Sequence, residues 1–207
     1  MTNSLRPFSM HGCWKKTLMS NRFDEHIIEV LITQEAIGRR VAEMGGELAA
    51  DCGNSVPLLV GVLTGSAMFL ADLARNMDIP LEMDFMAVAS YGGSELRQSN
   101  GAVRITKDLN TIIEGRDVLL VEGIVDTGMT VGYLMRNLQA RKPRSIRLCT
   151  LLDKPARRIV RVPIAFRGFE IPDRFVVGYG LDFRQRYRNL PYIGVLSGEA
   201  TGLTREK

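Results

Sequence analysis

Residues 118–130 read Val-Leu-Leu-Val-Glu-Gly-Ile-Val-Asp-Thr-Gly-Met-Thr, and this stretch decides the fold. The apolar run Val118–Val121 predicts a strand that is buried on both faces of a parallel sheet. A helix is predicted directly after the acidic turn, because apolar residues recur there at the spacing of one helix face: Val131, Leu134, Met135 and Leu138. A strand that runs through a short turn into a helix is the repeating unit of α/β folds.

The sequence on either side repeats this alternation. Apolar spacing predicts a helix over 33–51, with Thr33 as its N-cap. Short apolar runs predict three more strands, at Leu58–Leu63, Leu81–Ala87 and Ile146–Leu152, with a second helix between the first two. We therefore expect an α/β fold: a mostly parallel central sheet with helices on both faces, plus a small hood subdomain.

The hood is expected from a change in composition after Pro155. Short aromatic-rich segments follow that residue, separated by Pro and Gly. With parts of the N-terminal region, residues 155–207 are expected to form the hood of a single domain spanning 1–207, whereas residues 1–20 are expected to be mobile. The polar, glycine-containing stretch Tyr91–Ala102 is long enough to indicate a lid or binding loop.

Composition narrows the functional classes. The 207 residues carry 27 Lys and Arg against 23 Asp and Glu, and a net charge of +4 is too small to indicate a nucleic-acid partner. The uncharged stretch Cys52–Ala71 contains Pro and Gly, so it predicts a strand, a turn and a helix start rather than a membrane span. The three cysteines have unrelated spacings, so the sequence predicts neither a disulfide framework nor a zinc site. We therefore expect the protein in the reducing cytoplasm.

The acidic turn carries the chemistry. It brings the carboxylates of Glu122 and Asp126, the hydroxyls of Thr127 and Thr130, and the flexible Gly128 to the start of a helix. Free backbone N–H groups and the helix dipole make such a terminus a phosphate site. The carboxylates indicate a cation or hydroxyl groups beside that phosphate, such as Mg²⁺ or a ribose.

Three other interpretations of the turn must be weighed, and the first of them stays open on the motif alone. Asp126 and Thr127 could merely cap the helix. The spacing from Gly123 to Thr130 resembles a P-loop, but Met129 stands where the phosphate-binding lysine belongs. Asp-Thr-Gly also occurs in aspartic proteases, whose folds are rich in strands, whereas this motif leads into a helix.

Residues 118–130 resemble the phosphoribosyl-diphosphate (PRPP) binding motif of type I phosphoribosyltransferases, and the chain is similar in particular to the hypoxanthine-guanine phosphoribosyltransferases. Further motifs carry the resemblance in the same order: Gly61–Ser66, Ser90–Tyr91, Leu151–Lys154, Phe169–Asp173, Phe175–Asp182 and Arg188–Pro191. The resemblance implies purine salvage, in which the 5-phosphoribosyl group of PRPP is transferred to N9 of hypoxanthine or guanine. The products would be IMP or GMP and pyrophosphate.

The resemblance also implies roles for individual residues. Five would bind the 5-phosphate: Asp126, Thr127, Gly128, Met129 and Thr130. Asp126 would also be the catalytic acid and base near purine N7. Glu122 would face the ribose hydroxyls and, with Asp182, hold Mg²⁺ as the cofactor.

Other matching positions would bind the base and the leaving group. Four residues would contact the purine: Lys154, Phe175, Val176 and Asp182. Lys154 at the O6 atom would favour 6-oxopurines, because a cation cannot accept a hydrogen bond from an amino group. Three would bind pyrophosphate: Thr64, Gly65 and Arg188, with a cis peptide before Thr64. Ser90 and Tyr91 would stand at the start of the lid segment. The resemblance also implies that the protein forms a homodimer or homotetramer.

Two positions depart from the family pattern. Gly123 stands where the family has an aspartate after the glutamate, and Thr64 stands where a lysine or arginine is usual. Losing a hydrogen-bonded charged contact costs on the order of 1.5–3 kcal/mol. We therefore expect weakened catalysis, and Gly123→Asp is expected to raise the affinity for PRPP.

Alternatives remain open at this level. One is an impaired PRPP- or nucleotide-binding paralogue that acts as a sensor or partner, and another is an enzyme for a different 6-oxopurine such as xanthine. Three groups of residues also fit simpler structural roles, as a solvated basic face (Lys154, Arg157, Arg158), as strand core (Phe175, Tyr179) and as a surface ion pair (Asp182, Arg188).

Overall fold

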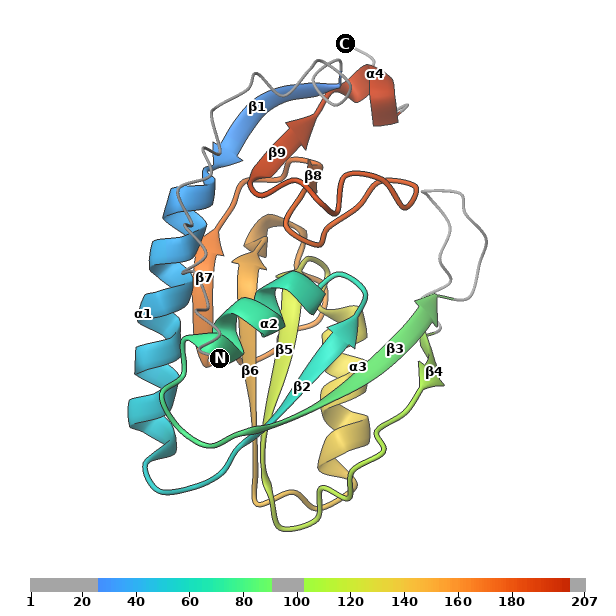
Figure 1. The fold of residues 1–207 in the computed structure, drawn as a ribbon. Coiled ribbons are helices and arrows are strands. Elements are labelled where there is room, and N and C mark those ends of the chain that lie inside the picture. Colours follow the sequence, from blue (N-terminus) through green and yellow to red (C-terminus); the bar gives the residue numbers. More distant parts are fainter. Residues whose placement is uncertain (1–25, 91–102, 202–207) are drawn as a thin grey trace, which may run out of the picture.

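A six-stranded sheet forms the centre of the protein (Figure 1). The computed structural model describes residues 26–90 and 103–201. The strands lie in the order β4-β3-β2-β5-β6-β7, and all are parallel except β4, which runs antiparallel to β3. Their bounds are β2 Leu58–Leu63, β3 Glu82–Ser90, β4 Val103–Lys107, β5 Asp117–Val125, β6 Ser145–Asp153 and β7 Phe166–Glu170.

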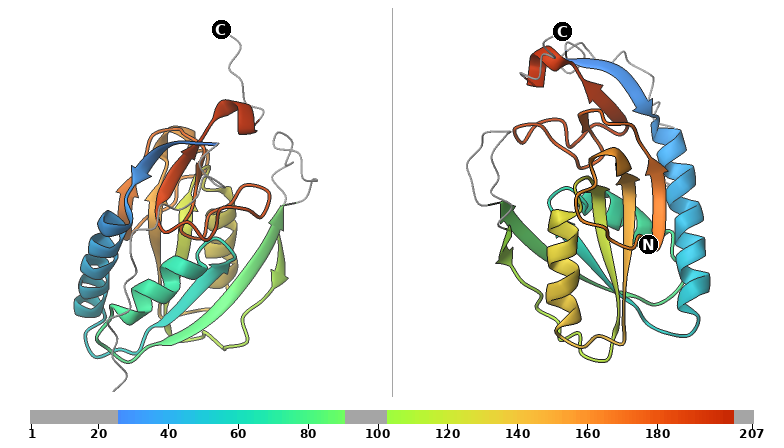
Figure 2. Two further views of the ribbon diagram at one scale, coloured as in Figure 1. Left: turned by 45° about the horizontal axis from the view of Figure 1, so that its top comes forward. Right: turned by 180° about the vertical axis from the view of Figure 1, so that it is seen from behind.

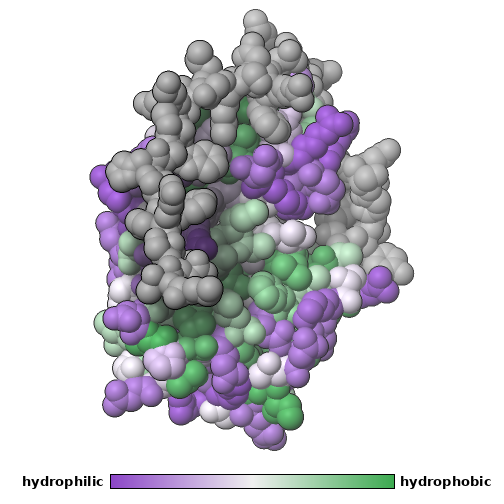
Figure 3. All heavy atoms as spheres, viewed as in Figure 1, coloured by the Kyte–Doolittle hydropathy of each residue, from purple (hydrophilic) through white to green (hydrophobic). Residues whose placement is uncertain are grey.

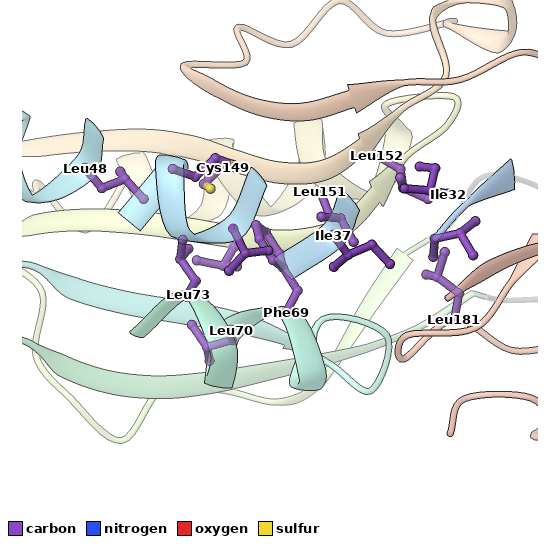
Figure 4. Close-up of a cluster of buried hydrophobic side chains, with 14 of the residues drawn as sticks. Ile32, Ile37, Leu48, Phe69, Leu70, Leu73, Cys149, Leu151, Leu152 and Leu181 are labelled. Atoms are coloured by element: carbon purple, nitrogen blue, oxygen red, sulfur yellow. The ribbon is translucent and has the colours of Figure 1, made fainter. Parts of the chain in front are cut away.

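Helices cover both faces of this sheet, as the second view in Figure 2 shows from behind. Helices α1 (Gln34–Cys52) and α2 (Ala67–Arg75) pack on one face, and α3 (Met129–Gln139) packs on the other. Thr33 caps α1 by accepting a hydrogen bond from the Ala36 N–H at 3.2 Å. Figure 4 shows the core under α1 and α2, where fully buried side chains from helices and strands interdigitate.

A second, three-stranded sheet forms the hood above the carboxyl ends of the parallel strands (Figure 1). Strands β1 (Ile27–Ile32), β9 (Ile193–Leu196) and β8 (Val176–Val177) are antiparallel neighbours in that order. The short helix α4 (Gly198–Thr201) follows β9, and a 3₁₀ turn, η1 (Pro155–Arg157), follows β6. The fold class expected from the sequence is therefore confirmed.

Several details differ from the sequence predictions. Strand β5 continues to Val125, so Glu122 and Gly123 belong to the strand rather than to the turn. Helix α2 ends at Arg75, before the buried Met77. Strands β1, β4 and β7 were not predicted. Strand β1 shows no alternation, and β4 alternates over only five residues. Strand β7 lies in the stretch expected to form the hood, but it pairs with β6 in the central sheet. The stretches expected to be mobile (1–20) and to form the lid (from Tyr91) lie outside the described residues.

No helix within residues 26–90 and 103–201 is long and apolar enough to span a membrane.

Candidate active site

The candidate site lies at the carboxyl edge of the parallel strands, where the hood faces the sheet. This edge is the general ligand position in open α/β sheets. Strands β2, β5 and β6 end there at residues 63, 125 and 153. They deliver the turns that contain Thr64, Asp126 and Lys154, which the sequence places far apart.

The turn between β5 and α3 is shaped for an anion. Gly128 is the N-cap of α3 and adopts a left-handed φ of 81°. A Cβ atom there would overlap the carbonyl oxygen of Val160, so only glycine fits. The first bond within the helix is donated by the Gly132 N–H to the Gly128 carbonyl, which leaves the N–H groups of the first turn for a ligand.

Simple helix capping does not account for this turn. The Thr127 Oγ1 accepts only a long hydrogen bond of 3.4 Å from the Met129 N–H, and the N-cap position belongs to Gly128. Asp126 instead lies beside basic residues: its Oδ2 is 3.3 Å from Arg157 Nη1 and 3.9 Å from Lys154 Nζ.

Two carboxyl oxygens, one on β5 and one in the turn that follows it, are buried without a partner among the described residues: Glu122 Oε2 and Asp126 Oδ1. Burial raises the pKa of Glu122 to about 8. Buried polar atoms in native proteins are nearly always hydrogen-bonded. Both oxygens can therefore contact a polar group of a ligand, and the Glu122 carboxyl can donate as well as accept while it keeps its proton.

A basic residue that the motifs did not assign supports the turn from the other side. Arg158 donates from Nε to the Asp126 carbonyl at 3.0 Å and from Nη2 to the Val125 carbonyl at 3.1 Å, and it also pairs with the buried Asp153. Its side chain is only 15% exposed, so Arg158 is not part of a solvated face. The charge pattern Asp153–Arg158 was visible in the sequence, but the contact with residue 126 was not.

Lys154 is also buried, with 5% of its side chain exposed. Its Nζ donates to the Arg174 carbonyl at 2.8 Å and lies 3.8 Å from Asp173 Oδ1. The solvated-face interpretation of Lys154 is therefore wrong as well. The ammonium group is held within the site, between the β5 turn and the loop before β8.

Aromatic packing shapes the hood side of the site. The rings of Phe175 and Phe183 meet edge to face, with centroids 5.6 Å apart. Val176 is buried at the start of β8, and the backbone carbonyl of Phe175 accepts from the Leu196 N–H. The hood thus presents aromatic residues next to the loop that carries Asp182.

Asp182 and Arg188 form an ion pair in the hood loop, with Arg188 Nη2 2.9 Å from Asp182 Oδ1. Their side chains are 27% and 22% exposed. Asp182 Oδ2 accepts the Gln185 N–H at 2.8 Å, and Arg188 Nη1 donates to the Gly180 carbonyl at 2.7 Å. The pair therefore stabilises its own loop.

The turn after β2 contains a cis peptide between Leu63 and Thr64, as the resemblance implies. The Thr64 carbonyl accepts from the Ala67 N–H at 3.2 Å, and Ser66 Oγ donates to the Val62 carbonyl at 2.8 Å. Ser90 lies at the end of β3, where its backbone pairs with Val103. Tyr91 lies outside the described residues.

The acidic residues fit Mg²⁺ only together with a substrate. No cluster of three or more His, Cys, Asp or Glu side chains occurs in the described part of the chain. Mg²⁺ commonly takes one or two carboxylates and completes its shell with phosphate oxygens and water. The unpartnered Glu122 Oε2 fits that pattern, whereas both oxygens of Asp182 already have partners, Arg188 in an ion pair and the Gln185 N–H in a hydrogen bond.

Comparison with known proteins agrees with this geometry. The model of the phosphoribosyl transferase domain matches residues 29–184, and the chain belongs to this family. It is 53% identical over 173 residues to a hypoxanthine-guanine phosphoribosyltransferase of Bacillus subtilis, covering 83% of this chain and 95% of that protein. A hypoxanthine phosphoribosyltransferase of Salmonella typhimurium is 49% identical over 173 residues, covering 82% and 96%.

A solved structure gives the same result. The crystal structure of a hypoxanthine phosphoribosyltransferase from Staphylococcus aureus superposes with a TM-score of 0.83 at 46% identity, covering 88% of this chain and 98% of that one. Proteins named as hypoxanthine or hypoxanthine-guanine phosphoribosyltransferases thus resemble this chain in both sequence and fold.

Proposed function

We propose that this protein is a purine-salvage enzyme that transfers the 5-phosphoribosyl group of PRPP to N9 of hypoxanthine or guanine. The observation that carries the proposal is the pair of buried, unpartnered carboxylate oxygens of Glu122 and Asp126 beside the amino end of α3. A sugar phosphate supplies what both features lack: hydroxyl donors for the carboxylates and an anion for the helix terminus.

In this reaction the bond from C1 of the ribose to pyrophosphate breaks, and the bond from C1 to N9 forms. The first turn of α3 holds the 5-phosphate, with Thr127, Gly128, Met129 and Thr130 around it. Asp126 accepts the proton that leaves purine N7 and returns it in the reverse reaction. Lys154 donates to O6, Phe175 stacks on the base and Val176 contacts it through its carbonyl.

Pyrophosphate is bound by Thr64, Gly65 and Arg188, and Ser90 and Tyr91 begin the segment that excludes water. When bound, Mg²⁺ neutralises the charge that develops on the leaving pyrophosphate. Glu122 is its proposed first ligand from the protein. Asp182 would be the second only by exchanging its present contacts with Arg188 and Gln185.

An active enzyme is favoured over an impaired paralogue, because relatives at about half identity over most of the chain are named as enzymes. Gly123 and Thr64 remove one carboxylate and one cation from the family pattern, so we expect reduced activity rather than none. Xanthine is the alternative base, since Lys154 suits any 6-oxopurine.

The assembly proposed is a homodimer or homotetramer in the cytoplasm. Figure 3 shows hydrophobic residues gathered on the face that carries α2, and the exposed Met68 and Met83 belong to α2 and β3. Exposed apolar patches of this kind commonly cover protein interfaces. The two described cysteines, Cys52 and Cys149, are free thiols, in keeping with a reducing compartment.

Release of pyrophosphate from PRPP and Mg²⁺ tests the proposal, with hypoxanthine, guanine, xanthine and adenine assayed in parallel. Turnover is expected with the 6-oxopurines and not with adenine. Asp126→Asn should lower kcat about 100-fold or more, whereas the exposed Asp78→Asn should not change it. Absence of turnover with every base, despite binding of IMP, would favour the sensor alternative.

A further inference from the structure

The turn after β2 rests on two glycines from other parts of the chain. The carbonyl oxygen of Gly65 lies so close to Gly180 that a Cβ atom there would overlap it. A Cβ atom at Gly123 would lie 3.0 Å from the same oxygen and 3.2 Å from Leu181 Cδ2. The Gly65 carbonyl therefore lies between the end of β5 and the hood loop. It has room there because neither Gly123 nor Gly180 has a side chain.

The hood loop that contributes Gly180 also carries the candidate pyrophosphate residue. The Gly180 N–H donates to the Arg188 carbonyl at 2.9 Å, and the Gly180 carbonyl accepts from Arg188 Nη1 at 2.7 Å. Arg188 in turn pairs with Asp182. The Arg188 guanidinium is thus hydrogen-bonded to Gly180, the residue that lies against the Gly65 carbonyl.

A polar contact fastens the same loop to α2. The Tyr179 hydroxyl donates to Asp72 Oδ2 at 2.6 Å. Burial and the neighbouring carboxylate raise the pKa of Tyr179, so its hydroxyl stays protonated and remains a donor. Helix α2 starts two residues after Gly65, so the hood loop contacts both the turn and the helix that follows it. Figures 1 and 2 show this loop above the turn between β2 and α2.

Apolar packing completes the connection. Leu181 follows Gly180 and lies at the hood end of the buried cluster, next to Ile32 in Figure 4. Its Cδ2 would also be 3.7 Å from a Cβ atom at Gly65, which is an ordinary contact distance. The turn is therefore bounded on its hood side by Gly180 and Leu181, and on its sheet side by Gly123.

We propose that Gly123, Gly180 and Tyr179 are positioning residues for pyrophosphate: they seat the Gly65 carbonyl and so fix the Thr64–Gly65 turn against the loop that bears Arg188. The inference rests on the proposed function, since it assigns that turn to pyrophosphate. Gly123 then has a role of its own. It gives the turn room to lie directly on β5, because no side chain at position 123 separates the strand from the Gly65 carbonyl.

This inference reverses the expectation drawn from sequence alone. A missing carboxylate predicts that Gly123→Asp raises the affinity for PRPP. The structure predicts the opposite sign, because any side chain at position 123 must push the Gly65 carbonyl or Leu181 aside. A misplacement of about 1 Å can cost about 100-fold in rate. The smaller shift that a side chain at position 123 requires should therefore cost less than that.

The test compares Gly123→Ala, Gly123→Asp and Tyr179→Phe with the wild type, and uses Gly46→Ala as the matched control. Gly46 lies in α1 with no atom near its would-be Cβ. Three quantities are measured: KM for PRPP in the forward reaction, KM for pyrophosphate in the reverse reaction with IMP, and the Kd of IMP alone by calorimetry. IMP carries no pyrophosphate, so its binding should not depend on the Thr64–Gly65 turn. An unchanged Kd of IMP therefore also shows that a variant is folded.

We expect both Gly123 variants to raise the two KM values about tenfold, which corresponds to about 1.4 kcal/mol. Tyr179→Phe should raise them several-fold, and the Kd of IMP should stay within about threefold in every variant. Gly46→Ala should match the wild type. A Gly123→Asp enzyme with unchanged or lower KM for PRPP overturns the inference, and so does an unchanged KM for pyrophosphate in Gly123→Ala and Tyr179→Phe. A wild type that releases no pyrophosphate overturns the proposed function itself.

Discussion

Replacing Glu122 by glutamine should stabilise the free protein, and the gain should grow with pH. The Glu122 carboxyl is buried with one unpartnered oxygen, and its pKa is raised from 4.5 to about 8. The folded chain therefore holds this proton more tightly than the unfolded chain does. Between these two pKa values, the free energy of unfolding falls as pH rises, because the folded state must either keep the proton or bury a charge.

The size of the effect follows from the two pKa values. Between about pH 5.5 and pH 7.5, the linkage relation gives a loss of about 2.5 kcal/mol for the wild type. This is an upper limit, because water can relieve part of the burial. For a chain of this length, about 1 kcal/mol shifts Tm by about 2–4 °C. The Tm of Glu122→Gln minus the Tm of the wild type should thus be about 5–10 °C larger at pH 7.5 than at pH 5.5.

The assay is thermal unfolding followed by circular dichroism, with EDTA present and no nucleotide. The Tm difference between variant and wild type is recorded at each pH, so that other titrating groups cancel. Glu114→Gln is the matched control, because Glu114 is an exposed loop residue. A Tm difference for Glu122→Gln that stays constant with pH, or that shrinks as pH rises, refutes the reasoning.

Three further variants probe the site. Gly128→Ala should lower the free energy of unfolding by at least about 1–2 kcal/mol, because its φ is left-handed, whereas Gly46→Ala should not lower it; urea unfolding measures both. Lys154→Gln should raise KM for the purine about tenfold and leave KM for PRPP within about twofold; equal effects on both would contradict its assignment to the base. Arg158→Met should cost about 1.5–3 kcal/mol of stability, because Asp153 loses one charged partner and keeps Arg167 as the other. It should also weaken IMP binding through the phosphate turn; calorimetry that finds wild-type affinity would exclude this support.

The sheet and its helices were predictable because their sequences follow simple periodicities. The run Val118–Val121 and the spacing after Thr33 each correspond to an observed element, with Thr33 as the N-cap. Strand β1 was not predictable in the same way. Its residues are only partly buried, and it is stabilised by pairing with β9 at the other end of the chain.

The candidate site was predictable where one short motif contains several of its residues. The β5–α3 turn is such a case, since local backbone geometry brings Asp126 and Gly128 together. The support from Arg158 and the contact of Gly65 with Gly180 were not predictable, because each joins residues that meet only through the tertiary fold. The sequence showed that Gly123 lacks a carboxylate, but it did not show that the space is filled by another backbone segment.

The pairing of β1 with β9 has a consequence for how the protein is made. The first described strand finds its neighbour only when the last strand has left the ribosome, whereas β2, β5 and β6 can pair earlier during synthesis. Contacts so distant along the chain form slowly. The hood, which we propose binds the base, should therefore form last. A nascent chain stalled before Ile193 would contain the β5–α3 turn, the proposed phosphate site, without a complete hood.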